Sequence, residues 1–130
     1  MDKNFQKVKD YLLELEYNIV SENPAEQLVV IEREEDGISN MVIDCEEPIL
    51  LIEQHIFNVK TESTELYKNL LMKNREIIHG AFVLDETGEK VLFRDTLQIE
   101  NLDINELEGS INSLSLLLSE YSDELIKFSK

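Results

Sequence analysis

The segment QLVVIEREEDGISNMVIDCE, residues 27–46, contains two runs rich in Val and Ile on either side of the dipeptide Asp36-Gly37. Such runs favour strands, because branched side chains pack well on a pleated surface. An Asp-Gly pair between two apolar runs is a strong short-range signal for a β-hairpin. The sequence therefore predicts two antiparallel strands, over residues 27–34 and 38–46.

More strand signals follow along the chain. Pro48 ends the second strand, and ILLIEQHIFNV, residues 49–59, is interpreted as a third because it is rich in Ile and Val. A buried helix is the alternative for this apolar run. Farther on, AFVL (81–84) and KVLFRDTL (90–97) lie on either side of the turn residues Asp85 to Gly88. This arrangement predicts a second hairpin.

Two amphipathic helices flank the first group of strands. Residues 3–17 place Phe5, Val8, Leu12 and Leu15 at helical spacing, and Asn18 is the expected C-cap. A second helix follows residue 60, with Thr61 or Ser63 as its N-cap.

A third helix begins at Asp103, where Glu106 stands three residues later and forms an acidic capping box. Its long apolar stripe consists of Leu107, Ile111, Leu114, Leu118, Tyr121 and Leu125. The predicted order is helix, three strands, helix, two strands, helix. We therefore expect a single α+β domain over residues 1–130, with an antiparallel sheet covered by helices.

Charge limits the kinds of partner. Lys and Arg total 12 against 28 Asp and Glu, which gives a net charge of -16 at pH 7. Such a surface repels nucleic-acid phosphates and anionic lipid headgroups. We expect neither nucleic acid nor membrane as a partner, and a protein partner instead. The charge also fits a simpler role in solubility, and both interpretations stay open.

The expected location is the cytoplasm. Cys45 is the one cysteine, so no internal disulfide can form, which fits a reducing compartment. The first residues, MDKNFQKVKD, lack the apolar core of a signal peptide. No apolar run approaches the roughly 20 residues that a membrane span requires.

Residues that could carry metal chemistry are few and scattered. His55, His79 and Cys45 fall on different predicted elements, without the spacing of metal ligands. The acidic segment 85–89 lacks the length and the terminal Glu of an EF-hand loop, and Asp and Gly suit a tight turn there. We expect no metal site.

One carboxylate stands apart from the polar faces. Alternation places Asp95 on the same face as Val91 and Phe93, where it could pair with Arg94 or a lysine, or end the buried part of the strand. The chain contains no nucleophile elbow, phosphate loop or dinucleotide fingerprint. We therefore predict no catalytic residue and no cofactor.

Apolar residues exceed what a simple core requires. The middle helix carries two stripes, Leu66/Leu70 and Tyr67/Leu71, and the last helix adds Leu116 and Leu117. One stripe can pack on the sheet, and the other is available to a partner. The alternative is that both helices are enclosed and every one of these residues is core.

Two stretches of sequence carry a family resemblance. GAFVLDETGEKVLFRDTLQIENLD, residues 80–103, is followed by INELEGSINSLSLLL, and LLMKN, residues 70–74, precedes them. Together with the element order, size and acidity, they resemble the type III secretion chaperone fold, and within it the YbjN-like branch.

The resemblance implies a homodimer formed largely through the middle helix and the adjacent strand, and so an interface at Leu66, Tyr67, Leu70 and Leu71. It also implies binding of a client polypeptide along apolar surfaces, without catalysis. Two alternatives remain: a regulatory adaptor that binds one folded partner, and an uncharacterised enzyme.

Overall fold

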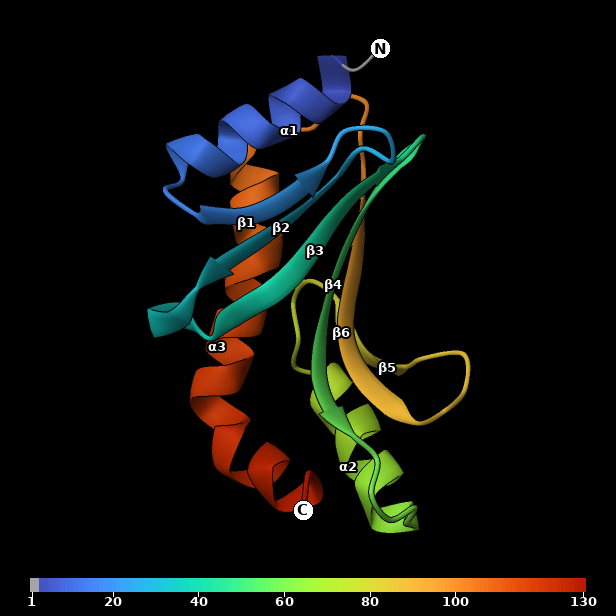
Figure 1. Cartoon of the computed structure of the whole chain (residues 1–130). Helices are drawn as coiled ribbons and strands as arrows, with labels where there is room; N and C mark the ends of the chain where they lie inside the picture. The colour runs from blue at the N-terminus through green and yellow to red at the C-terminus, as the bar shows by residue number, and fades with distance from the viewer. Residues whose placement is uncertain (1–2) are drawn as a thin grey trace.

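The computed structural model describes residues 3–130, which form three α-helices and one six-stranded antiparallel sheet (Figure 1). The helices are α1 (Lys3–Glu14), α2 (Thr64–Asn74) and α3 (Ile104–Phe128). The strands are β1 (Asn18–Asn23), β2 (Leu28–Arg33), β3 (Ile38–Glu46), β4 (Ile49–Asn58), β5 (Ala81–Leu84) and β6 (Lys90–Gln98). Their order in the sheet is β1-β2-β3-β4-β6-β5. The predicted α+β class is confirmed.

The chain has one strand more than the sequence predicts before the middle helix. Asn18 does not cap α1; it begins β1. The helix ends instead in a Schellman motif, in which Glu16 has a left-handed φ of 66° and the Tyr17 N–H donates to the Leu12 carbonyl at 3.0 Å. This turn redirects the chain into β1, an edge strand that is mostly polar and exposed.

The β2–β3 hairpin is confirmed, but its connection is longer than a two-residue turn. A short 3-10 helix, η1 (Glu34–Asp36), precedes Gly37, which has a φ of 77°. A Cβ at Gly37 would lie 2.8 Å from Leu118 Cδ1 on α3. The left-handed backbone conformation favours glycine here, whereas the Leu118 methyl group ends a flexible side chain and can move aside for a Cβ.

Residues 49–58 form a strand, which excludes the buried-helix alternative. β4 pairs with β3 on one side and with β6 on the other, so it occupies the centre of the sheet. Its alternation places Leu50, Ile52 and Gln54 on the buried face. The register shifts between His55 and Phe57, so that Phe57 also reaches the core.

All three helices contribute to one core on one face of the sheet. Phe5, Val8 and Leu12 of α1, with Leu66 and Leu70 of α2, belong to the same buried cluster as the inward side chains of the strands. The long helix α3 adds Leu107, Ile111, Leu114, Leu117 and Leu125. Outward side chains of the central strands are only partly buried or exposed, as expected when one face of an antiparallel sheet meets water.

The two later helices begin at the caps that the sequence indicates. Ser63 Oγ accepts from the Leu66 N–H at 3.0 Å. At α3, the Asp103 carboxylate accepts from the Glu106 N–H at 2.8 Å, and the Glu106 side chain accepts from the Asp103 N–H at 3.1 Å. These bonds satisfy N–H groups that the first helical turn leaves without a partner.

The last residue of α2 closes the outer edge of β5. The Asn74 side chain accepts from the Phe82 N–H at 2.7 Å and donates to the Phe82 carbonyl at 3.2 Å. It occupies the side of β5 that β6 does not pair with. Gly80 allows the chain to turn into β5, with a φ of 86° and Phe93 Cζ only 2.5 Å from where a Cβ would stand.

Candidate protein-binding surface

The two apolar stripes of α2 have different surroundings. Leu66 and Leu70 are buried in the core, so they are not available on the surface of this chain. Leu71 is 69% exposed, and the neighbouring Met72 is 64% exposed. Tyr67 is half-buried, and its hydroxyl donates to Glu62 at 3.2 Å. Of the four interface residues expected from the sequence, Tyr67 and Leu71 remain as surface candidates.

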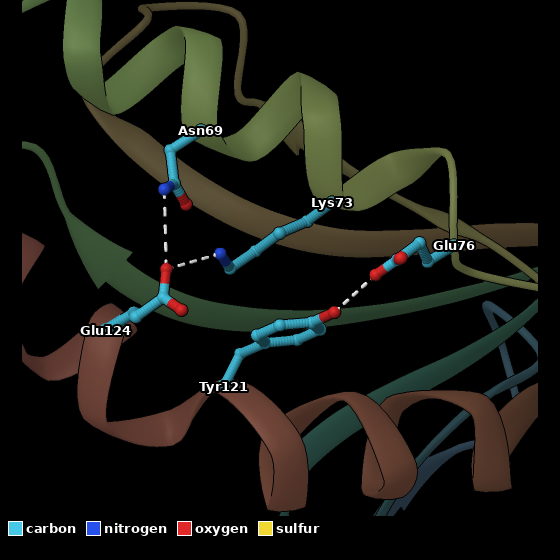
Figure 2. Close-up of polar contacts among 5 residues, drawn as sticks. All are labelled: Asn69, Lys73, Glu76, Tyr121 and Glu124. Carbon is cyan, nitrogen blue, oxygen red and sulfur yellow. Dashed lines mark hydrogen bonds and ion pairs between the residues drawn. The ribbon is translucent and has the colours of Figure 1, made fainter.

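A polar network joins α2 and the residue Glu76 that follows it to α3 (Figure 2). Lys73 is 7% exposed, and its ammonium lies 2.6 Å from Glu124 Oε2 and 4.4 Å from the centre of the Tyr121 ring. The Asn69 amide donates to the same Glu124 oxygen at 3.3 Å. A buried ammonium requires such partners, and they fix α2 against the C-terminal half of α3.

The network also changes the acidity of its members. The hydrogen bond from Lys73, together with one from Asn69, lowers the pKa of Glu124 below its ordinary value. The Tyr121 hydroxyl donates to the Glu76 carboxylate, and this bond raises the pKa of Tyr121 to about 12. Both shifts stabilise the protonation states that these groups have at neutral pH, so the network is a structural link.

An apolar groove lies next to the network, between residues 76–79 and α3. It has a volume of about 370 Å³, and Ile77, Leu117 and Tyr121 are among its apolar lining residues. Ile78 and Leu116 also line the groove and are 82% and 62% exposed. Large exposed apolar side chains beside a groove are typical of a protein-binding site.

The segment that forms one wall of the groove is bound firmly to α3. The Ser113 hydroxyl accepts from the His79 N–H at 3.3 Å and donates to the His79 carbonyl at 2.7 Å. The His79 ring also packs against α3, where a Cβ at Gly109 would stand at an ordinary van der Waals distance of 3.6 Å from it. The groove is therefore preformed in this structure.

The sequence predicts part of this surface. The second stripe of α2 and the surplus on α3 are found at Leu71 and Leu116, while Leu117 belongs to the core. Met72 and Ile78 were not predicted. Met72 falls outside both stripes, and Ile78 lies in a loop, where helical periodicity gives no signal.

Asp95 has a structural role. It accepts from the Ser110 hydroxyl of α3 at 2.6 Å and from the Thr96 N–H at 2.9 Å. Of the alternatives that the sequence leaves open, the pairing with Arg94 does not form, because Arg94 points to the other face of β6 and meets Glu53 at 3.2 Å. Asp95 therefore attaches the sheet to α3.

The scattered metal-ligand candidates do not assemble. His55 lies on the exposed side of β4 and bonds to Asn58 at 2.8 Å, while Cys45 is in the core, where burial raises its pKa to about 11. Within residues 3–130, no group of three or more His, Cys, Asp or Glu lies together as metal ligands would. In the acidic turn, Asp85 Oδ1 accepts from the N–H groups of Glu89 and Lys90, so the turn itself uses this oxygen.

The most perturbed carboxylate is one that the sequence does not single out. Burial, followed by the nearby charge of Glu46, raises the pKa of Asp44 to about 6. Its cross-strand neighbours are Leu28 and Leu51. No nucleophile or cation stands opposite it in the register, so Asp44 alone does not form a catalytic site.

The family follows from the sequence as a whole. The model of the family described as CesT_Tir_1 matches residues 1–130. The chain belongs to the CesT_Tir_1 family. No curated protein matches the sequence. This match and the similar structures described next confirm the predicted secretion chaperone-like, YbjN-like fold.

Solved structures with this fold share little sequence with the chain. YbjN of E. coli, described as a candidate transcription regulator, is 14% identical, with a TM-score of 0.71 over 92% of each chain. The HopA1–SchA chaperone–effector complex gives 14% identity and a TM-score of 0.64 over 92% of this chain and 95% of that one. The Yersinia pestis type III secretion chaperone SycH was solved with a fragment of YscM2. It is 16% identical to this chain, with a TM-score of 0.57 over 98% of this chain and 100% of that one.

No helix within residues 3–130 combines the length and the apolar character needed to cross a bilayer.

Proposed function

We propose that this chain is a non-enzymatic, chaperone-like protein-binding module that forms a homodimer and binds a client polypeptide through apolar helix and strand surfaces. The family and the fold support a protein-binding role, since two of the similar structures were solved with a protein partner. The net charge of -16 and the single cysteine support a cytoplasmic protein that does not bind nucleic acid or membranes.

The observation that carries the homodimer is the outer side of α2. Leu71 and Met72 stand next to each other in its last turns and are largely exposed, while Tyr67 lies one turn before Leu71. Two such helices placed against each other would remove these side chains from water, which contributes roughly 25 cal/mol per Å² of apolar area. A contact about a twofold axis uses the same patch on both copies.

Leu71→Glu tests this interface. A charge at the centre of an apolar contact should convert the dimer into a monomer, as seen by light scattering coupled to gel filtration. The helix content by circular dichroism should not change, because Leu71 does not contribute to the monomer core.

Leu13→Glu is the matched control. Leu13 is also an exposed leucine on a helix, but on α1, and the variant should keep the mass of the wild-type protein. A dimer that survives Leu71→Glu would place the interface elsewhere and contradict this assignment.

A regulatory adaptor is the second candidate. It is supported by the likeness to YbjN, whose described role is regulatory. Affinity purification from the native cell separates the two functions. A chaperone should retain unfolded or secreted polypeptides, and an adaptor should retain one folded protein at a fixed ratio.

A further inference from the structure

The groove between residues 76–79 and α3 is lined by a long stretch of α3. Its lining residues on α3 recur at the spacing of one helix face, from Gly109 through Ser113 and Leu117 to Tyr121. The twelve steps from Gly109 to Tyr121, at 1.5 Å per residue, give the lining stretch of α3 a length of about 18 Å, or about three helical turns. A ligand that fills it therefore has to present apolar side chains over a similar length.

Charge defines the second property of the ligand. The lining residues include two carboxylates, Glu76 and Glu120, and no Lys or Arg. Glu76 stands at the end of the loop wall and Glu120 on α3, one turn after Leu116. Acidic groups around an apolar floor favour a ligand with basic residues flanking its apolar side, because opposite charges meet at the rim.

The backbone of residues 76–79 defines a third property of the ligand, its secondary structure. The backbone N–H and carbonyl of His79 are both bonded to the Ser113 hydroxyl. The Ile77 N–H donates to the Asn74 carbonyl at 3.3 Å. These groups are not free to pair with an added strand. An occupant that satisfies its own backbone, as an α-helix does, is therefore the better match.

We propose that this groove binds an amphipathic helix of a partner polypeptide, with its apolar side against Leu116, Leu117 and Ile78 and with Lys or Arg residues facing Glu76 and Glu120. This proposal rests on the protein-binding function above and names the kind of segment that is bound. The groove is separate from the exposed side chains Leu71 and Met72, which are not among its lining residues.

A synthetic helical peptide of about 12 residues, with Leu along one side and Lys on the other, is the probe. Fluorescence anisotropy with the full-length protein measures its dissociation constant. Leu116→Glu should weaken binding by about tenfold or more, because it places a charge on the apolar contact. Ile78→Asp, in the opposite wall, provides a second variant, and Leu13→Glu on α1 should bind like the wild type.

Two further comparisons test the charge. A peptide with Glu in place of Lys should bind more weakly, and Glu120→Lys should reduce the difference between the two peptides. High salt should weaken binding of the Lys peptide, since the charged contacts at the rim of the groove are exposed to solvent.

Three results would overturn the proposal. The Lys peptide fails to bind the wild-type protein, or it binds Leu116→Glu and Ile78→Asp as tightly as the wild type. In the third, Leu116→Glu halves the mass in light scattering, which would make the groove a contact between two copies. An intact dimer in Leu71→Glu, combined with lost peptide binding in Leu116→Glu, would support the groove and reject the proposed dimer interface on α2, so the two failures are distinguishable.

Discussion

The helices α1 and α2 are nearly equal in length, with 12 and 11 residues, yet they use their side chains differently. α1 buries three apolar residues and exposes one large apolar residue, Leu13. α2 buries two apolar residues and a lysine, Lys73, and exposes Leu71 and Met72 next to each other.

This difference separates two tasks. In α1 nearly all large apolar area stabilises the monomer. In α2 a charged side chain occupies a position that an apolar residue could fill, while apolar residues face outward. A sequence selected for monomer stability alone would not place them so, because the arrangement buries charge and exposes apolar surface.

The largest effect should come from the core side of α1. Leu12 is fully buried, so Leu12→Ala should lower the free energy of unfolding by about 2–5 kcal/mol, through lost burial and a residual cavity. Urea denaturation followed by circular dichroism measures it. Leu13→Ala on the same helix should stay near the wild-type value, and equal losses in the two variants would remove the distinction between core and surface on α1.

A smaller effect should come from the buried charge of α2. Lys73→Met keeps the length of the side chain and removes the ion pair, and we expect a loss of about 1–2 kcal/mol. The cost is moderate because Glu124 is half exposed and regains water. Lys68→Met, at an exposed position of α2, is the control. A Lys73→Met protein as stable as the wild type would show that the pair contributes no net stability.

The smallest effect is a pH dependence of the contact between α2 and α3. The pKa of Glu124 is lower in the folded protein, chiefly through the hydrogen bond from Lys73, so the unfolded chain binds its proton more readily. This stability is present above the unfolded pKa and is lost as the pH falls through the folded value. The free energy of unfolding, measured by urea denaturation at a series of acidic pH values, should therefore fall less steeply with decreasing pH in Glu124→Gln than in the wild type. Unchanged slopes would mean that the pair does not couple to folding.

Strong local signals in the sequence predicted the corresponding elements correctly. β3 has the predicted bounds because Gly37 and Pro48 enclose a run of apolar residues. The start of α3 is equally clear, since Asp103 and Glu106 form the capping box that the sequence indicates. Where turn and cap chemistry is local, the sequence is sufficient.

Other features depend on tertiary context and were missed. β1 has few apolar residues because it is an exposed edge, and Glu16 takes a left-handed conformation that glycine would have signalled. The candidate surface was predicted only in part. Helical periodicity identifies Leu71 as a surplus residue, but whether Leu70 or Leu71 faces the core depends on how α2 is rotated against the sheet.

The side chain of Asn74 has a consequence for assembly. A sheet grows into a fibre only when both of its outer strands can accept a further strand, and Asn74 already occupies the middle of β5 by bonding both polar groups of Phe82. The remaining outer strand, β1, pairs with β2 alone. Pairing at β1 can add one strand or join two copies through their β1 strands. The sheet then ends at β5, which Asn74 closes, so the asymmetry between the two edges limits polymerisation.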